Sequence, residues 1–162
     1  MKVIVTAGGQ GTKIWPFSRK KQPKQFQQII GQESLYTQNI KMLLNKYKPA
    51  DIFISTKQMY LRMAKEQAPE IPDENFIVEP DAAVGRGPAE GFVFLMLSLR
   101  HPNDVFTILQ SDCMYLPANK YLETLEVMER LVKRDQKLIS GGLMPTYPVI
   151  GVDYLLLGDQ VE

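Results

Sequence analysis

The sequence predicts an α/β protein with a mostly parallel sheet and helices on both of its faces. Short apolar runs rich in β-branched residues alternate along the chain with longer segments in which apolar residues recur at helical spacing. This order is typical of parallel sheets whose strands are joined by crossover helices. At 162 residues, with 44% hydrophobic and 23% charged residues, the chain is expected to form one domain over residues 1–162.

The individual elements follow from local signals. A first strand is expected at residues 2–7, because Val3, Ile4 and Val5 form a continuous apolar run. Ser34 is expected to cap a helix, and Pro88 suits the first turn of another, where its missing amide donor is not needed. The other expected strands cover residues 52–55, 76–78, 105–109, 137–143 and 153–157, with a short extended piece at 28–30, and the expected helices cover residues 34–47, 57–67, 88–100 and 121–133.

Three glycines, Gly8, Gly9 and Gly11, follow the first strand within four positions. Glycine lets the backbone bend closely around a ligand, and a loop of amides at a strand end is a concave site for phosphate oxygens. The segment then becomes strongly basic, through Lys13, Arg19, Lys20, Lys21 and Lys24. A glycine cluster alone is often a plain turn and a lysine run alone a solvated face, but together at the end of a first strand they favour a phosphate site.

Two common phosphate-binding loops do not fit this segment. A Walker A loop needs Gly-Lys followed by Ser or Thr, whereas Thr12 separates Gly11 from Lys13, and Ile14 comes next. A dinucleotide-binding loop needs a third glycine three places after the second, and that position is also Ile14. The loop therefore belongs to another class of phosphate site.

From Gly8 to Phe26 the sequence reads Gly-Gly-x-Gly-Thr-Lys-Ile-Trp-Pro-Phe-Ser-Arg-x-x-x-Pro-Lys-Gln-Phe. This pattern resembles the signature of the mannose-1-phosphate guanylyltransferases (GDP-mannose pyrophosphorylases), a branch of the sugar-nucleotide pyrophosphorylases, with Lys13 in place of the family's arginine. Trp15 is expected to pack this loop in place. The resemblance implies a three-layer, Rossmann-like nucleotidyltransferase fold. Because the family's domains continue well past the position of residue 162, we expect this chain to be the N-terminal, nucleotide-binding part of a truncated domain.

The resemblance also implies roles for individual residues. Lys24 is expected to neutralise the α-phosphate of the nucleotide, and Asp112, at the exit of the strand at 105–109, to bind Mg²⁺. With Lys13, these two residues make up the expected catalytic set. The expected nucleotide-binding residues are Ala7, Gly8, Gly9, Gly11, Thr12, Lys13, Glu79, Gly87 and Pro88, and the expected sugar-binding residues are Gly151 and Val152.

Three segments depart from the family's pattern. The region for base recognition reads Ala83-Val84-Gly85-Arg86 in place of Arg-Asn-Thr-Ala, and a plain loop between a strand and a helix is the alternative there. Cys113 replaces a histidine and is expected to be a small apolar residue that faces away from solvent. After Gly151, the side chains of Val152 and Asp153 replace a tyrosine and a glycine, which leaves the identity of the sugar open.

The resemblance implies an enzyme that joins GTP and a sugar 1-phosphate, with mannose 1-phosphate as the expected sugar, to give a GDP-sugar and pyrophosphate. No general base is needed, because the attacking phosphate is already an anion. Two alternatives stay open. One is a nucleotide-binding module or pseudoenzyme without transferase activity, and the other is a transferase for a different nucleoside triphosphate or sugar phosphate.

The composition argues against several other classes of protein. Nineteen basic and eighteen acidic residues leave a net charge of +1, so no overall field attracts nucleic acid or an anionic membrane. Cys113 is the only cysteine, which excludes an intrachain disulfide and suits a reducing compartment. With no leader-like segment and no long apolar run, we expect a cytoplasmic protein without a membrane partner. Apolar surface left by truncation is expected to favour homo-oligomers.

Overall fold

The computed structural model describes residues 1–10, 14–80, 85–150 and 152–159. Within these residues lie four strands, β1 (Lys2–Thr6), β2 (Ile52–Lys57), β3 (Phe76–Glu79) and β4 (Phe106–Gln110). They form one sheet in the order β3-β2-β1-β4, in which each neighbouring pair is parallel. Val5 of β1 lies opposite Ile54 on one side and Leu109 on the other. The glycine loop that follows β1 therefore starts between the carboxyl ends of β2 and β4.

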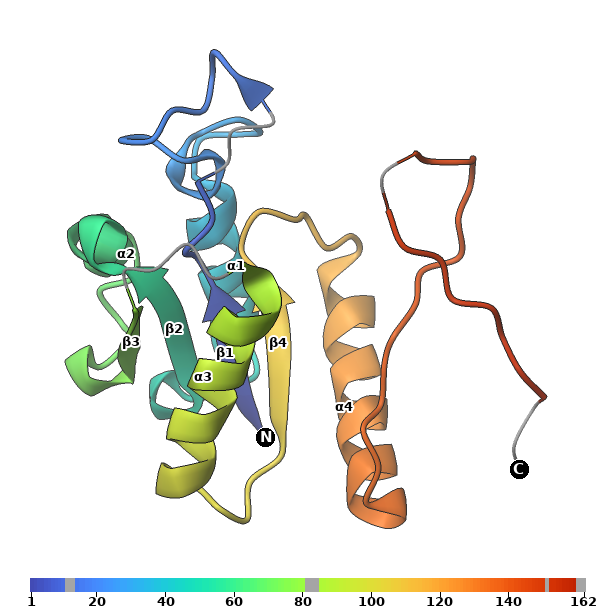
Figure 1. The fold of residues 1–162 in the computed structure, drawn as a ribbon. Helices are drawn as coiled ribbons and strands as arrows, with labels where there is room; N and C mark the ends of the chain where they lie inside the picture. The colour runs from blue at the N-terminus through green and yellow to red at the C-terminus, as the bar shows by residue number, and fades with distance from the viewer. Residues whose placement is uncertain (11–13, 81–84, 151, 160–162) are drawn as a thin grey trace.

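Helices cover both faces of the sheet (Figure 1): α1 (Leu35–Leu44), α2 (Leu61–Gln67), α3 (Arg86–Arg100) and α4 (Ala118–Asp135). Alternate residues of a strand point to opposite faces. Val3 and Val5 accordingly belong to one apolar cluster with Ile40 of α1, whereas Ile4 belongs to a second cluster with Val93 of α3. The resulting three layers confirm the predicted fold class.

Local signals explain where the helices begin. Ser34 caps α1, because its Oγ accepts a hydrogen bond of 3.1 Å from the Thr37 amide. The helix expected at 57–67 is a 3₁₀ turn, η4 (Gln58–Tyr60), followed by α2, and the third and fourth helices begin slightly earlier than expected. Other 3₁₀ turns are η2 (Lys24–Phe26), η3 (Pro49–Asp51) and η5 (Asp73–Asn75). None of the helices in the described ranges is long and apolar enough to cross a membrane.

Three predictions of extended structure are wrong. In the described chain, residues 137–143, 153–157 and 28–30 contain no strand, and the first two follow α4 as an irregular segment (Figure 1). A strand needs a neighbour to pair its backbone amides and carbonyls, and these segments pair with no strand of the described sheet. Their apolar side chains are consequently exposed, Leu138, Leu143 and Leu156 among them.

The prediction that Trp15 packs the signature loop in place is also wrong. Its side chain is 76% exposed, and that of Phe17 is exposed as well. The backbone of this loop instead turns back on itself through an antiparallel bridge between Arg19 and Gln22. The contacts that hold the loop to the sheet come from residues further along the signature, which are described below.

Candidate functional site

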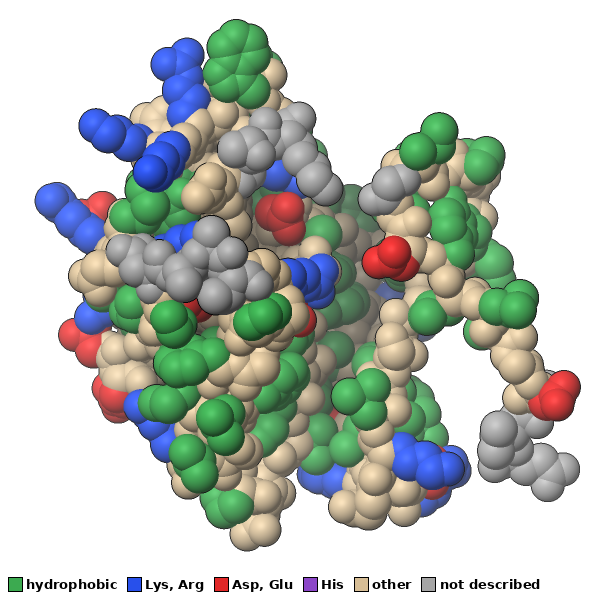
Figure 2. All heavy atoms as spheres, viewed as in Figure 1, with side chains coloured by type: hydrophobic (Ala, Val, Ile, Leu, Met, Phe, Trp, Pro, Cys, Tyr) green, Lys and Arg blue, Asp and Glu red, His purple; other side chains and the backbone are tan. Residues whose placement is uncertain are grey.

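A pocket of about 520 Å³ opens at the carboxyl edge of the sheet. In open parallel sheets, ligands bind at this edge. The pocket wall comes from all four strand ends, from the loop after β1 and from the first turn of α3, and includes Gly8, Gly9, Glu79, Arg86, Gln110 and Asp112. In the space-filling view, acidic and basic side chains lie close together beyond the upper end of α3 (Figure 2). The pocket is therefore suited to a charged, polar ligand.

At the β3 end of the pocket, the Glu79 carboxylate lies directly against Gly8. Ser55 Oγ donates a hydrogen bond of 2.7 Å to Glu79 Oε1 and so fixes the carboxylate. A Cβ atom added to Gly8 would lie 2.5 Å from the same oxygen, closer than real Cβ contacts. A side chain at position 8 would therefore displace the carboxylate, which in its present place can accept hydrogen bonds from a ligand.

Gln25 holds the start of the glycine loop. Its side chain is 3% exposed. Its Nε2 donates hydrogen bonds of 2.9 Å to the carbonyl of Ala7 and of 2.9 Å to the carbonyl of Gly9. Since these two carbonyls flank Gly8, one buried amide determines the path of the loop at the pocket wall.

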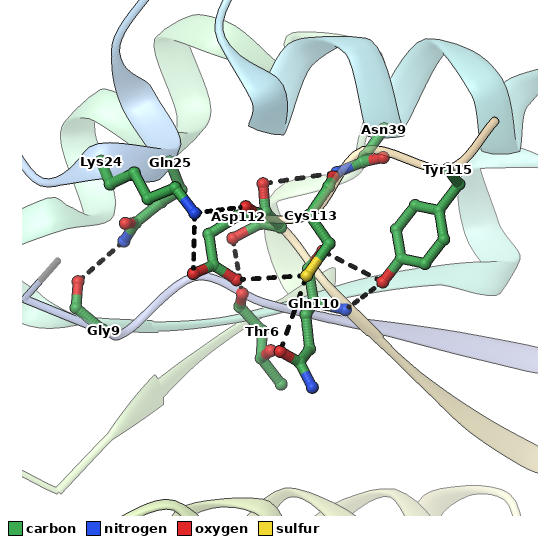
Figure 3. Close-up of polar contacts among 10 residues, drawn as sticks. Thr6, Gly9, Lys24, Gln25, Asn39, Gln110, Asp112, Cys113 and Tyr115 are labelled. Carbon is green, nitrogen blue, oxygen red and sulfur yellow. Dashed lines mark hydrogen bonds and ion pairs between the residues drawn. The ribbon is translucent and has the colours of Figure 1, made fainter. Parts of the chain in front are cut away.

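Lys24, in η2, reaches the loop that follows β4 (Figure 3). Its Nζ donates a hydrogen bond of 2.8 Å to the backbone oxygen of Asp112 and lies 3.6 Å from Asp112 Oδ2. The two side chains are 29% and 46% exposed, so water screens the pair and its contribution to stability is small. What matters is the placement, because the fold brings a cation and a carboxylate together at the pocket from positions 88 residues apart.

Polar groups also fix the backbone on both sides of Asp112. Asn39 Nδ2, from α1, donates to the carbonyls of Ser111 at 3.3 Å and Cys113 at 2.9 Å. Ser111 Oγ donates a hydrogen bond of 2.6 Å to the carbonyl of Thr6 in β1. These contacts, which Figure 3 shows together, hold the backbone on both sides of Asp112 in place at the edge of the pocket.

Cys113 is not shielded from solvent to the extent that the prediction required. Its side chain is only partly buried, and its Sγ lies 3.9 Å from Asp112 Oδ1. Burial, followed by the negative charge of Asp112, raises the pKa of the thiol, while the charges of Lys24 and Arg86 act in the opposite direction. The thiol therefore stays neutral at pH 7, which argues against a nucleophilic role.

The donors around Asp112 suit a magnesium ion that is shared with a ligand. Mg²⁺ is usually held by one or two carboxylates together with phosphate oxygens and water. Asp112 presents one partly exposed carboxylate at the pocket wall. In the part of the chain that the structure describes, no group of three or more His, Cys, Asp or Glu residues could hold a metal ion. A metal here would need oxygen atoms from the substrate.

The structure brings part of the predicted site together. Gly8, Gly9, Glu79 and Asp112 line one pocket, and Lys24 contacts Asp112 at its edge. The other predicted residues fall outside the pocket wall or outside the described residues. Ala7 is buried next to the pocket, Gly87 and Pro88 lie in the exposed first turn of α3, Val152 lies in the segment beyond α4, and Gly11, Thr12, Lys13 and Gly151 lie outside the described residues.

Three further residues of the site were not predicted, and each had a faint signal. Gln25 lies inside the signature itself, next to Lys24. Asn39 is a polar residue on the buried side of α1, between Tyr36 and Ile40. Arg86 follows Gly85 at the start of a helix, in the segment that departs from the family's pattern.

The fold and the pocket are those of an α/β protein in which a glycine loop follows the first strand and a Lys–Asp pair lies at the carboxyl edge of a parallel sheet. This arrangement suits a phosphorylated ligand. Sequence comparison identifies the family. The model of the Nucleotidyl transferase family matches residues 2–147, and the chain belongs to that family.

Individual relatives confirm the resemblance that the signature indicated. A mannose-1-phosphate guanylyltransferase of Escherichia coli is 28% identical over 161 residues, which are 96% of this chain and 34% of the relative. One from Salmonella montevideo is 27% identical over 160 residues, which are 98% of this chain and 33% of the relative. The chain thus spans about a third of the length of these relatives.

A solved structure supports the fold independently. The crystal structure described as mannose-1-phosphate geranyltransferase from Thermus thermophilus superposes with a TM-score of 0.71 at 21% identity. The match covers 82% of this chain and 38% of that one. The sheet and its helices therefore share the fold of that structure.

Proposed function

We propose that this chain is the nucleotide-binding part of an enzyme that transfers a nucleotide from GTP to mannose 1-phosphate, releasing pyrophosphate. The observation that carries the proposal is the contact between Lys24 and Asp112 beside the glycine loop, 2.8 Å from Nζ to the backbone oxygen. The proposed reaction brings two phosphate anions together, so it requires a cation that neutralises their charge. A carboxylate beside that cation can hold a metal ion that does the same.

In this proposal, each group of residues along the pocket contacts a different part of the substrates. Glu79 can accept hydrogen bonds from the base, and the backbone of Gly8 and Gly9 lies beside the path of the phosphates. Lys24 neutralises the α-phosphate as the oxygen of the sugar phosphate bonds to it and the bond to pyrophosphate breaks. Asp112 would hold Mg²⁺, which supplies charge neutralisation for the phosphate oxygens when it is bound.

The test measures pyrophosphate released from GTP and mannose 1-phosphate in the presence of Mg²⁺. Removing a preorganised charge typically lowers turnover by roughly 10²–10³-fold, so we expect Lys24→Gln and Asp112→Asn each to show a loss of this size. The matched control is Lys48→Gln, which removes an exposed lysine next to η3. Near-normal turnover in Lys24→Gln or Asp112→Asn removes that residue from the proposed mechanism.

A second candidate function, a nucleotide-binding module without transferase activity, is favoured by Cys113, which follows Asp112 where the family's pattern has a histidine. A nucleotide-binding module would bind GTP, measured by calorimetry, yet release no pyrophosphate. Repeating both measurements with ATP, UTP and CTP identifies the base. A chain that binds none of the four triphosphates has neither function.

A further inference from the structure

Arg86, the first residue of α3, is a cation at the pocket wall that the proposed function leaves without a role. Its Nε donates a hydrogen bond of 2.5 Å to Glu90 Oε1, one turn further along the helix. With the Gln110 amide oriented so that its oxygen faces α3, that oxygen accepts from Arg86 Nη1 at 2.7 Å and from Nη2 at 2.8 Å. The opposite orientation would set the amide NH₂ against two donors. Arg86 thus spans from α3 to the last residue of β4, two positions before Asp112.

The contact with Gln110 satisfies the guanidinium group poorly. Two terminal nitrogens converge on one neutral oxygen. A planar guanidinium matches an anion with two oxygens better, because each nitrogen then donates to its own oxygen and both hydrogen bonds are charge-assisted. The Arg86 side chain is 63% exposed, so it can exchange Gln110 for a ligand without leaving a buried group unpaired. This geometry favours a phosphate as the occupant.

Arg86 and Lys24 approach the end of β4 from opposite faces of the sheet. Lys24 belongs to η2, which packs against α1 and α2. Arg86 belongs to α3, which packs on the other face through Val93 and Leu97. A phosphate placed next to Asp112 would therefore have one cation on each side.

The role proposed for Lys24 identifies this phosphate as the α-phosphate. Lys24 contacts Asp112, and Arg86 reaches Gln110, two positions before Asp112, from the other face of the sheet. We propose that Arg86 binds the α-phosphate of the nucleotide from the α3 side, opposite Lys24. This role rests on the proposed function. Arg86 would also provide the site with a guanidinium group, which Lys13 lacks in the place of the family's arginine.

The experiment compares three ligands by calorimetry: guanosine, GMP and pyrophosphate. The difference in affinity between GMP and guanosine measures the contribution of the α-phosphate to binding. The affinity for pyrophosphate measures binding at the rest of the triphosphate site. We expect Arg86→Gln to weaken GMP binding by about tenfold to a hundredfold, the range typical of charge-assisted hydrogen bonds, and to leave guanosine and pyrophosphate binding unchanged. Arg86→Lys should recover only part of the loss, because it keeps the charge and loses the fork.

One control completes the design. Arg100→Gln removes an exposed arginine from the other end of α3 and should leave all three affinities unchanged. An equal loss for guanosine and GMP in Arg86→Gln would show a structural role and overturn the assignment, as would unchanged GMP binding or a loss confined to pyrophosphate.

The same experiment separates this inference from the proposed function. If the unaltered chain binds GMP more tightly than guanosine, and Arg86→Gln shows the same difference in affinity, only the role of Arg86 is refuted. If the unaltered chain binds no guanine compound, and none of the adenine, uracil and cytosine equivalents, the proposed function fails and Arg86 has no nucleotide to bind.

Discussion

Replacing Gln25 with methionine tests whether one buried amide holds the glycine loop in its binding conformation. Methionine has nearly the same length and shape but cannot donate a hydrogen bond. The substitution removes the two 2.9 Å hydrogen bonds to the carbonyls of Ala7 and Gly9. The Ala7 carbonyl keeps a contact of 3.3 Å from Thr56 Oγ1, so the Gly9 carbonyl is the group that is left to find water.

The magnitude follows from the number of bonds lost. Each neutral hydrogen bond contributes about 0.5–1.5 kcal/mol to stability, so two of them amount to about 1–3 kcal/mol. The loop should also leave its position at the pocket wall, because within the described residues no other side-chain donor reaches the Gly9 carbonyl. We therefore expect the affinity for GTP to fall as well as the stability.

Urea unfolding followed by circular dichroism measures the first effect, and calorimetric titration with GTP measures the second. Gln28→Met is the matched control, since Gln28 is exposed and lies three residues further along. We expect it to change the free energy of unfolding by less than about 0.5 kcal/mol. If Gln25→Met behaves like this control in both assays, the reasoning about the loop is refuted.

Two further predictions concern a close approach and a buried hydroxyl. Gly8→Ala should weaken GTP binding while leaving stability nearly unchanged, because the new Cβ, 2.5 Å from Glu79 Oε1, displaces the carboxylate at the end of a flexible side chain. Gly158→Ala, in the segment beyond α4 and with no atom within 4 Å of its Cβ, should affect neither, and equal titration results for both variants would contradict this expectation. Tyr47→Phe should leave the free energy of unfolding at pH 7 unchanged or raise it by up to about 1 kcal/mol, because among the described residues the Tyr47 hydroxyl is buried without a hydrogen-bond partner. Burial raises the pKa of Tyr47 to about 12, so the hydroxyl stays neutral and the change in the free energy of unfolding should be the same from about pH 6 to pH 9. A decrease of more than about 1 kcal/mol in the free energy of unfolding would show that the hydroxyl has a partner.

Much of the fold was predictable because its signals are local. The apolar run of β1, the Ser34 cap and the alternation of strands and helices each depend on neighbouring residues, and each is confirmed. The segments at 137–143 and 153–157 were predicted wrongly from the same kind of signal. Apolar runs favour strands, but a strand forms only where a partner accepts its backbone hydrogen bonds, and a short sequence window does not contain that partner.

The order of the residues is enough to find the family signature, the glycine loop after the first strand, and the position of Asp112 at a strand exit. Which side chains meet at the pocket depends on the folded chain: Lys24 with Asp112, Asn39 with the backbone on both sides of Asp112, and Arg86 with Gln110. These contacts join positions that are far apart in the chain. Their formation depends on strand order and on the packing of helices on opposite faces, and neither is contained in any local stretch of residues.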